Sequence, residues 1–282
     1  MLYDAHIHCG LGQPFSVKNL NSDELKIGLR KMMENYLKMG INRLRDGGDK
    51  WGVGLMAKEI AKEFPLDFRT PIHGIYKRGS YGEFLGKPVD NGDESCRLID
   101  ELSRKKADFI KIILTGIMSF DDFGKADPAQ FSRKELKKMV DHAHGLGLKT
   151  MVHVNTPQAI RTAIEAGVDT IEHGYCIDDS CLELLAASET IWVPTLAPFA
   201  NIAACPEDHP MQAYRVVSKM YFEGHRKAVQ KAVNLGVKIA LGSDSGATLV
   251  PHGQGTLDEF KFCQLCGLSE EKLSAVGELL FN

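Results

Sequence analysis

Two histidines, His6 and His8, stand one residue apart in the segment DAHIHCG. In a β-strand, side chains at positions i and i+2 point to the same face, whereas on a helix this spacing separates them by roughly 200°. If residues 2–8 form a strand, both imidazoles point toward one place, where they could bind a metal ion. Such a site needs further ligands that converge on the pair.

Four more residues with suitable side chains lie within or at the end of short apolar runs: Lys111, His153, His173 and Asp244. A lone buried histidine is more often a core residue than a ligand. Four histidines and an aspartate at strand ends together favour a catalytic metal centre with open positions for water. Lys111, inside FIKIIL, costs free energy unless it is neutralised or paired with a nearby carboxylate.

Alternating strand-like and helix-like segments would position these residues. The predicted strands are residues 2–8, 41–46, 68–76, 108–114, 148–154, 168–173, 190–195 and 237–244. Eight strands with helices between them predict an α/β fold, a (β/α)8 TIM barrel, as a single domain over residues 1–282 with a terminal helix at 268–282. An open doubly wound sheet is the alternative, but it usually has five or six strands. The site of a barrel lies at the C-terminal ends of its strands.

The composition narrows the class of partner. A net charge of −3 gives no reason to expect a nucleic-acid or anionic-membrane partner, and no apolar run is long enough to span a bilayer. The start of the chain lacks the pattern of a signal peptide. Seven cysteines, an odd number, suit reduced thiols, and the lone pair Cys263 and Cys266 is interpreted as structural. We expect a cytoplasmic protein with a small-molecule substrate, compatible with a homo-oligomer.

Six segments in order resemble the amidohydrolase superfamily, and more closely its metal-dependent prolidase and imidazolonepropionase-like branch. They are AHIHCG, FIKIILTGIMS, VHVN, AGVDTIEHGYCID, WVPTL and LGSDSGATLVPHGQG. The resemblance implies two divalent metal ions, zinc by default, with manganese and iron also fitting. It implies that His6, His8 and Asp244 bind the more buried ion and that His153 and His173 bind the other. Lys111 would be a carboxylated lysine, its carbamate bridging both ions.

The resemblance also implies a mechanism. A hydroxide that bridges the metals would attack the substrate carbonyl, and Asp244 would carry the proton to the leaving nitrogen. The expected reaction is hydrolysis of an amide-type C–N bond in a dipeptide, an N-acyl amino acid or a cyclic amide. Many relatives carry an accessory β-sandwich, but only 38 residues follow Asp244, so we expect a barrel without one.

Substrate-binding residues are harder to predict. The loop YKRGSYGEFLGK offers Tyr76, Lys77, Arg78 and Tyr81, which could bind a carboxylate or could simply be solvated surface. Two further candidates are Asn155, at a position where relatives often have histidine, and His252, in the loop after the last strand. His73 could lie at the pocket floor, and Asp46 could line the pocket or cap a helix.

Three rival functions remain open. A mononuclear nucleobase-type deaminase on the same barrel would normally need a glutamate soon after His153, and VHVNTPQA has none. A lactonase or phosphotriesterase would use the same metal set. A non-catalytic scaffold barrel would be expected to have lost ligands. The pair His142 and His144 repeats the HxH spacing but lies in a predicted helix, so we interpret it as surface or helix-end residues.

Overall fold

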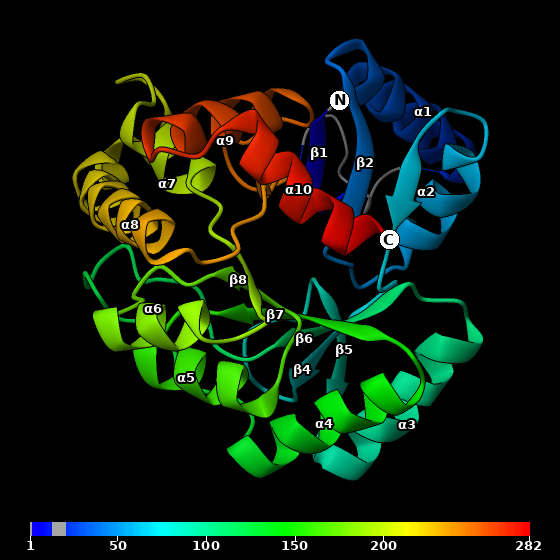
Figure 1. Cartoon of the computed structure of the whole chain (residues 1–282). Coiled ribbons are helices and arrows are strands. Elements are labelled where there is room, and N and C mark those ends of the chain that lie inside the picture. The colour runs from blue at the N-terminus through cyan, green and yellow to red at the C-terminus, as the bar shows by residue number, and fades with distance from the viewer. Residues whose placement is uncertain (1, 13–20) are drawn as a thin grey trace.

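A computed structural model describes residues 2–12 and 21–282 of the chain. Strands and helices alternate along it, as the sequence predicts (Figure 1). The strands are β1 (Leu2–Ile7), β2 (Ile41–Asp46), β3 (Asp67–Arg69), β4 (Gly74–Lys77), β5 (Gly86–Val89), β6 (Phe109–Ile113), β7 (Lys149–Val154), β8 (Thr170–His173) and β9 (Ile191–Val193). The helices are α1 (Ser22–Lys38), α2 (Val53–Ala61), α3 (Gly92–Arg104), α4 (Arg133–Gly145), α5 (Pro157–Ala166), α6 (Asp179–Ala186), α7 (Ala197–Ala203), the 3-10 helix η2 (Pro210–Tyr214), α8 (Arg215–Leu235), α9 (Gln254–Leu265) and α10 (Glu270–Phe281).

The strands pair in parallel in two runs, β1-β2-β3 and β5-β4-β6-β7-β8-β9. The predicted eighth strand, residues 237–244, joins the runs through backbone hydrogen bonds. Trp192 N donates to Lys238 O over 2.9 Å, and Ala5 N donates to Leu241 O over 2.8 Å. This segment therefore closes the sheet between β9 and β1, which confirms the (β/α)8 barrel. The described residues contain no β-sandwich beside it.

The third barrel strand differs from the prediction. Residues 68–76 were expected to form one strand, but they are divided into β3 and β4 by a break at Pro71 and Ile72. Proline has no N–H to give to a ladder, and Ile72 has a φ of 69°, outside the β region. Part of the predicted loop is instead β5, paired with β4. Gly86 there lies so close to Gly74 that a Cβ would be 1.7 Å from the Gly74 carbonyl oxygen.

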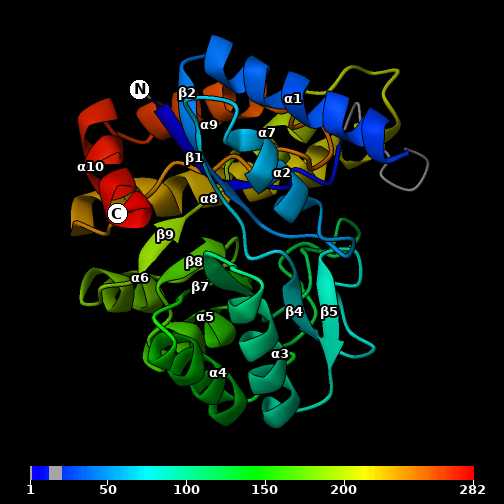
Figure 2. The same ribbon diagram turned by 90° about the vertical axis from the view of Figure 1, so that its right-hand side faces the viewer.

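The helices cover the outside of the barrel. Figure 2 shows α3, α4 and α5 outside the sheet of β4 to β8, with α1 and α2 next to β1 and β2. Capping boxes begin two of them, with Asn21 at the N-cap of α1 and Ser132 at that of α4. The predicted terminal helix is α10, and it is attached to β1 because Tyr3 Oη donates to Leu273 O over 2.7 Å.

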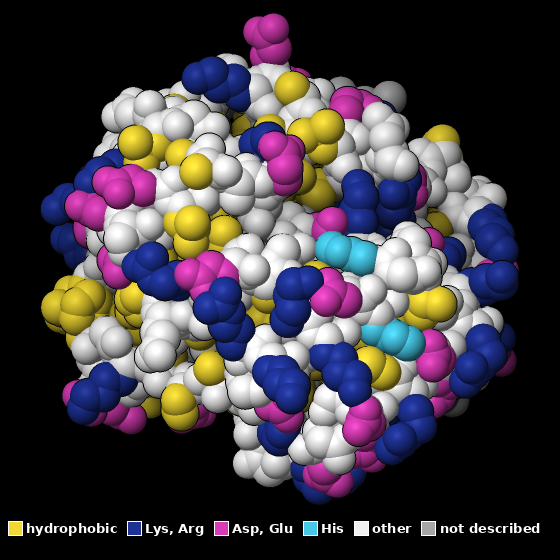
Figure 3. Space-filling model, turned by 60° about the horizontal axis from the view of Figure 1, so that its bottom comes forward, with side chains coloured by type: hydrophobic (Ala, Val, Ile, Leu, Met, Phe, Trp, Pro, Cys, Tyr) yellow, Lys and Arg dark blue, Asp and Glu magenta, His cyan; other side chains and the backbone are white. Residues whose placement is uncertain are grey.

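The surface carries both signs of charge. On the face shown in Figure 3, Lys and Arg side chains alternate with Asp and Glu, and histidines lie among them. Many of these charges form exposed ion pairs, such as Lys137 with Asp141 and Lys138 with Asp93. None of the helices in residues 2–12 and 21–282 is long and apolar enough to cross a membrane.

Candidate metal centre

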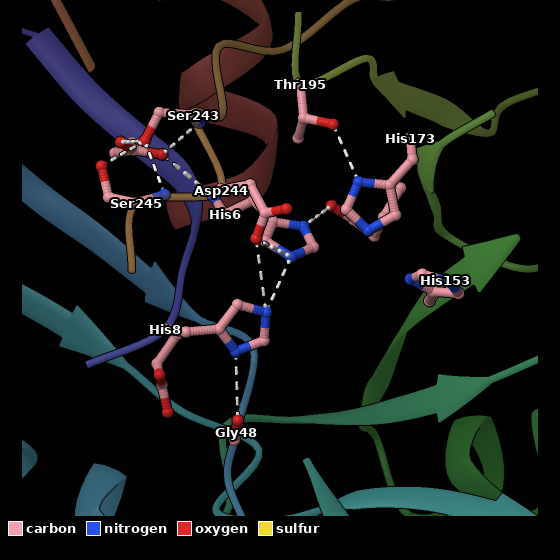
Figure 4. A network of polar contacts seen from close by, with 12 residues as sticks. His6, His8, Gly48, His153, His173, Thr195, Ser243, Asp244 and Ser245 are labelled. Atoms are coloured by element: carbon pink, nitrogen blue, oxygen red, sulfur yellow. Dashed lines mark hydrogen bonds and ion pairs between the residues drawn. The ribbon is translucent and has the colours of Figure 1, made fainter. Parts of the chain in front are cut away.

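Three of the predicted ligands meet at the seam where β1 joins the eighth strand. The Nε2 atoms of His6 and His8 are 3.3 Å apart. The Asp244 Oδ1 atom is 3.7 Å from His6 Nε2 and 3.5 Å from His8 Nε2. Figure 4 shows the three side chains pointing toward one another. Atoms this close, two imidazole nitrogens and a carboxylate oxygen, form a donor set suited to a divalent transition metal.

The other two histidines lie across from this trio. The His173 ring centroid is 4.9 Å from that of His6 and 4.6 Å from that of His153. His153 comes from the end of β7 and His173 from the end of β8, which pair in register. The structure therefore brings all four predicted histidines into one cluster (Figure 4).

Each histidine has one ring nitrogen fixed by the protein. His6 Nδ1 contacts Glu172 Oε2 at 2.5 Å, and His8 Nδ1 donates to Gly48 O at 3.2 Å. His153 Nε2 donates to Gly116 O at 3.2 Å, and His173 Nδ1 donates to the Thr195 hydroxyl at 2.8 Å. Such contacts set the tautomer and leave the other nitrogen of each ring to bind metal.

Lys111 is an electrostatic neighbour of all four histidines, and its charge lowers the pKa of each ring. Its side chain is completely buried, and within the described residues its Nζ atom has no hydrogen-bond partner. Burial lowers the pKa of the Lys111 ammonium group, although the Glu172 and Asp244 carboxylates oppose the shift. An unpaired buried amine is costly as a cation, so this site favours a neutral or chemically modified nitrogen.

Burial also determines the protonation of the other ligands. It lowers the pKa of His8 and of His153 to about 3, with the Lys111 charge as the next cause. Burial lowers the pKa of His6 and of His173 well below the usual value. All four imidazoles are therefore neutral at pH 7 and can offer a lone pair to a metal. Burial raises the pKa of Asp244, while Lys111 opposes this.

The backbone at the site is strained. His173, Thr195 and Asp244 have φ values of 66°, 51° and 60°, in the left-handed region that residues with a side chain seldom adopt. Each follows or ends a barrel strand, and the turn aims its side chain across the barrel mouth. Strain of this kind costs on the order of 1–3 kcal/mol per residue and gathers at functional sites.

Sequence reasoning missed the residues that hold the ligands in place. Glu172 is fully buried and contacts His6, and Thr195 contacts His173. Asp4 accepts from the backbone N–H groups of His6 and Ser243, at 3.1 and 2.9 Å. The sequence does carry a signal for Asp4 and Glu172. Both lie inside predicted strands, where a buried carboxylate needs a partner.

A cavity of about 800 Å³ opens over the cluster. Among the predicted substrate residues, Tyr81, Asn155 and His252 line it, whereas Tyr76 and Lys77 do not. Tyr76 is buried against Leu85 and Ile113, since the predicted loop turns back as β5.

The basic residues expected to bind a substrate carboxylate are paired elsewhere. Lys77 Nζ is 2.8 Å from Glu135, and Arg78 Nε is 2.8 Å from Asp90. His252 faces the cavity, but its Nδ1 and Nε2 atoms lie 3.0 Å from the Tyr36 hydroxyl and 3.1 Å from Leu11 O.

Two residues with open roles are structural. His73 Nδ1 donates to Asp49 O at 2.7 Å, away from the cluster. Asp46 accepts from Cys9 N at 3.1 Å and from the Thr70 hydroxyl at 2.8 Å, which ties the ends of β1 and β2 together.

Known proteins similar to this chain include a family model and several individual relatives. Residues 2–266 match the model of the amidohydrolase family. An uncharacterized protein of Mycobacterium tuberculosis is 30% identical over 273 residues, which are 95% of this chain and 69% of that protein. Ochratoxinase of Aspergillus niger is 30% identical over 178 residues, 59% of this chain and 37% of that enzyme.

Solved structures share the fold. The crystal structure of a Xaa-Pro dipeptidase superposes with a TM-score of 0.77 at 23% identity, covering 95% of this chain and 70% of that one. Ochratoxinase of A. niger gives a TM-score of 0.77 at 22% identity, covering 98% and 68%. The chain belongs to the amidohydrolase family, as its motifs predicted.

Proposed function

We propose that the chain is a binuclear metal-dependent hydrolase of amide-type C–N bonds, with zinc as the metal we expect, and that carboxylated Lys111 would be a ligand shared by the two cations. The buried Lys111 Nζ atom, which has no partner among the described residues, carries this proposal. A neutral amine at this place can form an N–C bond with CO2 and release one proton to solvent. The product is a carbamate, an anionic ligand at a place where an ammonium group would be an unpaired cation. Two cations surrounded by neutral imidazoles need such an anion.

The ligands divide into two sets. His6, His8 and Asp244 would hold one cation, His153 and His173 the other, and Lys111 would be a ligand to both. When bound, the cations would polarise the scissile carbonyl and lower the pKa of the attacking water. The donor set of imidazoles and carboxylates fits zinc well.

The protein's own groups then orient ligands and move a proton. Glu172 and Gly48 O fix the rings of His6 and His8, so that both Nε2 atoms face Asp244. Asp244 is the general acid–base residue: its side chain is 16% exposed, the most open of the trio with His6 and His8, and it lines the cavity. It would accept a proton from the attacking water and deliver it to the leaving nitrogen.

The test is metal stoichiometry on the wild type and on Lys111→Ala, measured by inductively coupled plasma mass spectrometry. We expect two metals per chain in the wild type and a sharp loss in the variant. Lys77→Ala is the matched control, because Lys77 is also partly buried but pairs with Glu135 outside the cavity.

A second readout addresses the bridge directly. In carbon-13-labelled bicarbonate, the wild type should show a carbamate resonance in the NMR spectrum that is missing in Lys111→Ala. One metal per chain, unaffected by the Lys111 substitution, would overturn the bridge and favour a mononuclear centre.

A further inference from the structure

The walls of the cavity are aromatic and aliphatic. Three loops and α7 contribute the side chains of these walls: Tyr81, Phe84, Met118, Tyr175, Phe199 and Ile202. Near the second ligand pair these rings form a continuous row. The Tyr81 ring centroid is 5.6 Å from that of His153, Tyr175 is stacked on His173 at 5.7 Å, and Phe199 meets Tyr175 edge to face at 4.5 Å.

Within this row, Tyr175 presents its ring and not a free hydroxyl to the cavity. The Tyr175 hydroxyl donates to Thr195 O at 2.9 Å, so its hydrogen is already used within the protein. At the cavity rim, Phe84 and Ile117 expose 39% and 48% of their surface. Large apolar side chains open to a cavity mark a surface that binds apolar groups.

Apart from the metal centre, the described side chains that line the cavity offer a substrate carboxylate no free cation. Among the described residues that line it, Lys111 is the one lysine or arginine, and its side chain is completely buried. His252 has both ring nitrogens engaged by Tyr36 and Leu11. His209, which also lines the cavity, accepts a hydrogen bond from Met211 N at its Nδ1 atom.

A carboxylate on the substrate would therefore lose hydration without gaining a cationic partner from these walls. We infer that the substrate is an uncharged amide with a bulky apolar, preferably aromatic, group, rather than a molecule with a free carboxylate. This inference rests on the proposed function, since it names the substrate class of the same site.

The test compares two amides that differ by one carboxylate. The metal-loaded protein is given N-benzoyl-2-phenylethylamine and N-benzoylphenylalanine, and kcat/KM is measured for each. We expect the neutral amide to be hydrolysed with a kcat/KM higher by about tenfold or more. Equal or faster hydrolysis of the acid would overturn the inference.

A charge added at the rim sharpens the test. Ile117→Arg places a guanidinium group at the cavity mouth and should lower the neutral-to-acid ratio of kcat/KM by about tenfold. Val216→Arg is the control, because Val216 is exposed on α8 and does not line the cavity. It should leave the ratio unchanged, and a ratio that also stays unchanged in Ile117→Arg would contradict the role assigned to the walls.

Binding separates this inference from the proposed function. If the protein carries two metals and hydrolyses neither amide, the proposed reaction fails for these substrates. Titration calorimetry with metal-free protein then tests the walls alone. Tighter binding of N-benzoyl-2-phenylethylamine than of N-benzoylphenylalanine would support the inference, and the reverse order would overturn it.

Discussion

The chain contains the pattern HxH twice, on β1 and on α4. On β1, His6 and His8 are buried, and their Nε2 atoms lie 3.3 Å apart. On α4, His142 and His144 separate: His142 Nε2 contacts Asp100 at 2.8 Å, and His144 Nε2 contacts Asp169 at 2.7 Å. Their side chains are 34% and 41% exposed.

The two histidine pairs differ because of the backbone that carries them and not because of the HxH pattern, which is the same in both. A strand places i and i+2 on one face, while a helix rotates them to different neighbours. The surface pair then finds solvated carboxylates, and such ion pairs contribute about 0–1 kcal/mol. The pair on β1 is buried and lies next to Asp244, a further candidate ligand. Metal binding therefore depends on convergence, and three predictions test this.

The largest effect should follow the loss of a convergent ligand. His8→Ala removes one nitrogen from the trio with His6 and Asp244, so metal content and kcat/KM should fall by more than about 100-fold, the upper range for losing a residue that merely supports a ligand. The measurements are metal analysis and amide hydrolysis.

The control for this variant is His144→Ala on α4. It should keep full metal content and activity, with a change in unfolding free energy within about 1 kcal/mol. Equal losses in the two variants would show that the contrast between the strand and helix pairs is wrong.

An intermediate effect should follow the loss of support for a ligand. Glu172→Gln keeps the size of the side chain but removes the negative charge that contacts His6 Nδ1, so metal affinity should fall by about 10–100-fold. Competition with a coloured chelator measures this.

Glu259→Gln is matched to it, because Glu259 is equally buried but accepts from Ala197 N, away from the ligands. Its metal affinity should match the wild type. An unchanged affinity in Glu172→Gln would mean that this carboxylate does not position His6.

The smallest effect concerns a histidine that is buried without converging on the others. His225 Nε2 donates to Pro194 O at 2.8 Å, and burial lowers its pKa to about 4 from 6.5. Between these pH values the unfolded chain binds a proton that the folded chain does not, so stability falls as pH drops. In the wild type, the free energy of unfolding should therefore be higher at pH 7 than at pH 5. In His225→Gln this difference should be smaller by about 1–2 kcal/mol.

Urea unfolding of the metal-free protein at the two pH values measures this change. Metal content should stay at the wild-type level, because burial alone does not make a ligand. An unaltered pH dependence would assign the proton uptake to another group.

Much of the barrel could be predicted because its strands are short apolar runs between amphipathic segments. The strand ends then identified His6, His8, His153, His173 and Asp244, whose convergence the structure shows. Their binding of metal remains a prediction. Periodicity reports which side chains are buried, so it works well where a strand is regular.

The rest depends on features that periodicity does not report. The break at Ile72 and the left-handed turns at His173 and Asp244 are backbone conformations imposed by tertiary contacts. Partners such as Glu172 for His6 lie 166 residues away, and nothing local marks the pairing. Lys77 has the right chemistry for a carboxylate, but Glu135 on α4 occupies it.

The seam between β1 and the eighth strand has a consequence for the order of synthesis. The Ser243 hydroxyl donates to the Asp4 carboxylate, and the two residues are 239 positions apart in the sequence. The same seam brings His6 and His8 next to Asp244. During synthesis, the ribosome adds His6 and His8 early and Asp244 late. During most of translation, β1 therefore lacks the eighth strand beside it. A metal ion that bound at that stage would meet an incomplete set of ligands. We therefore expect metal binding by the complete set of ligands only in the final steps of folding, when the last strand closes the barrel.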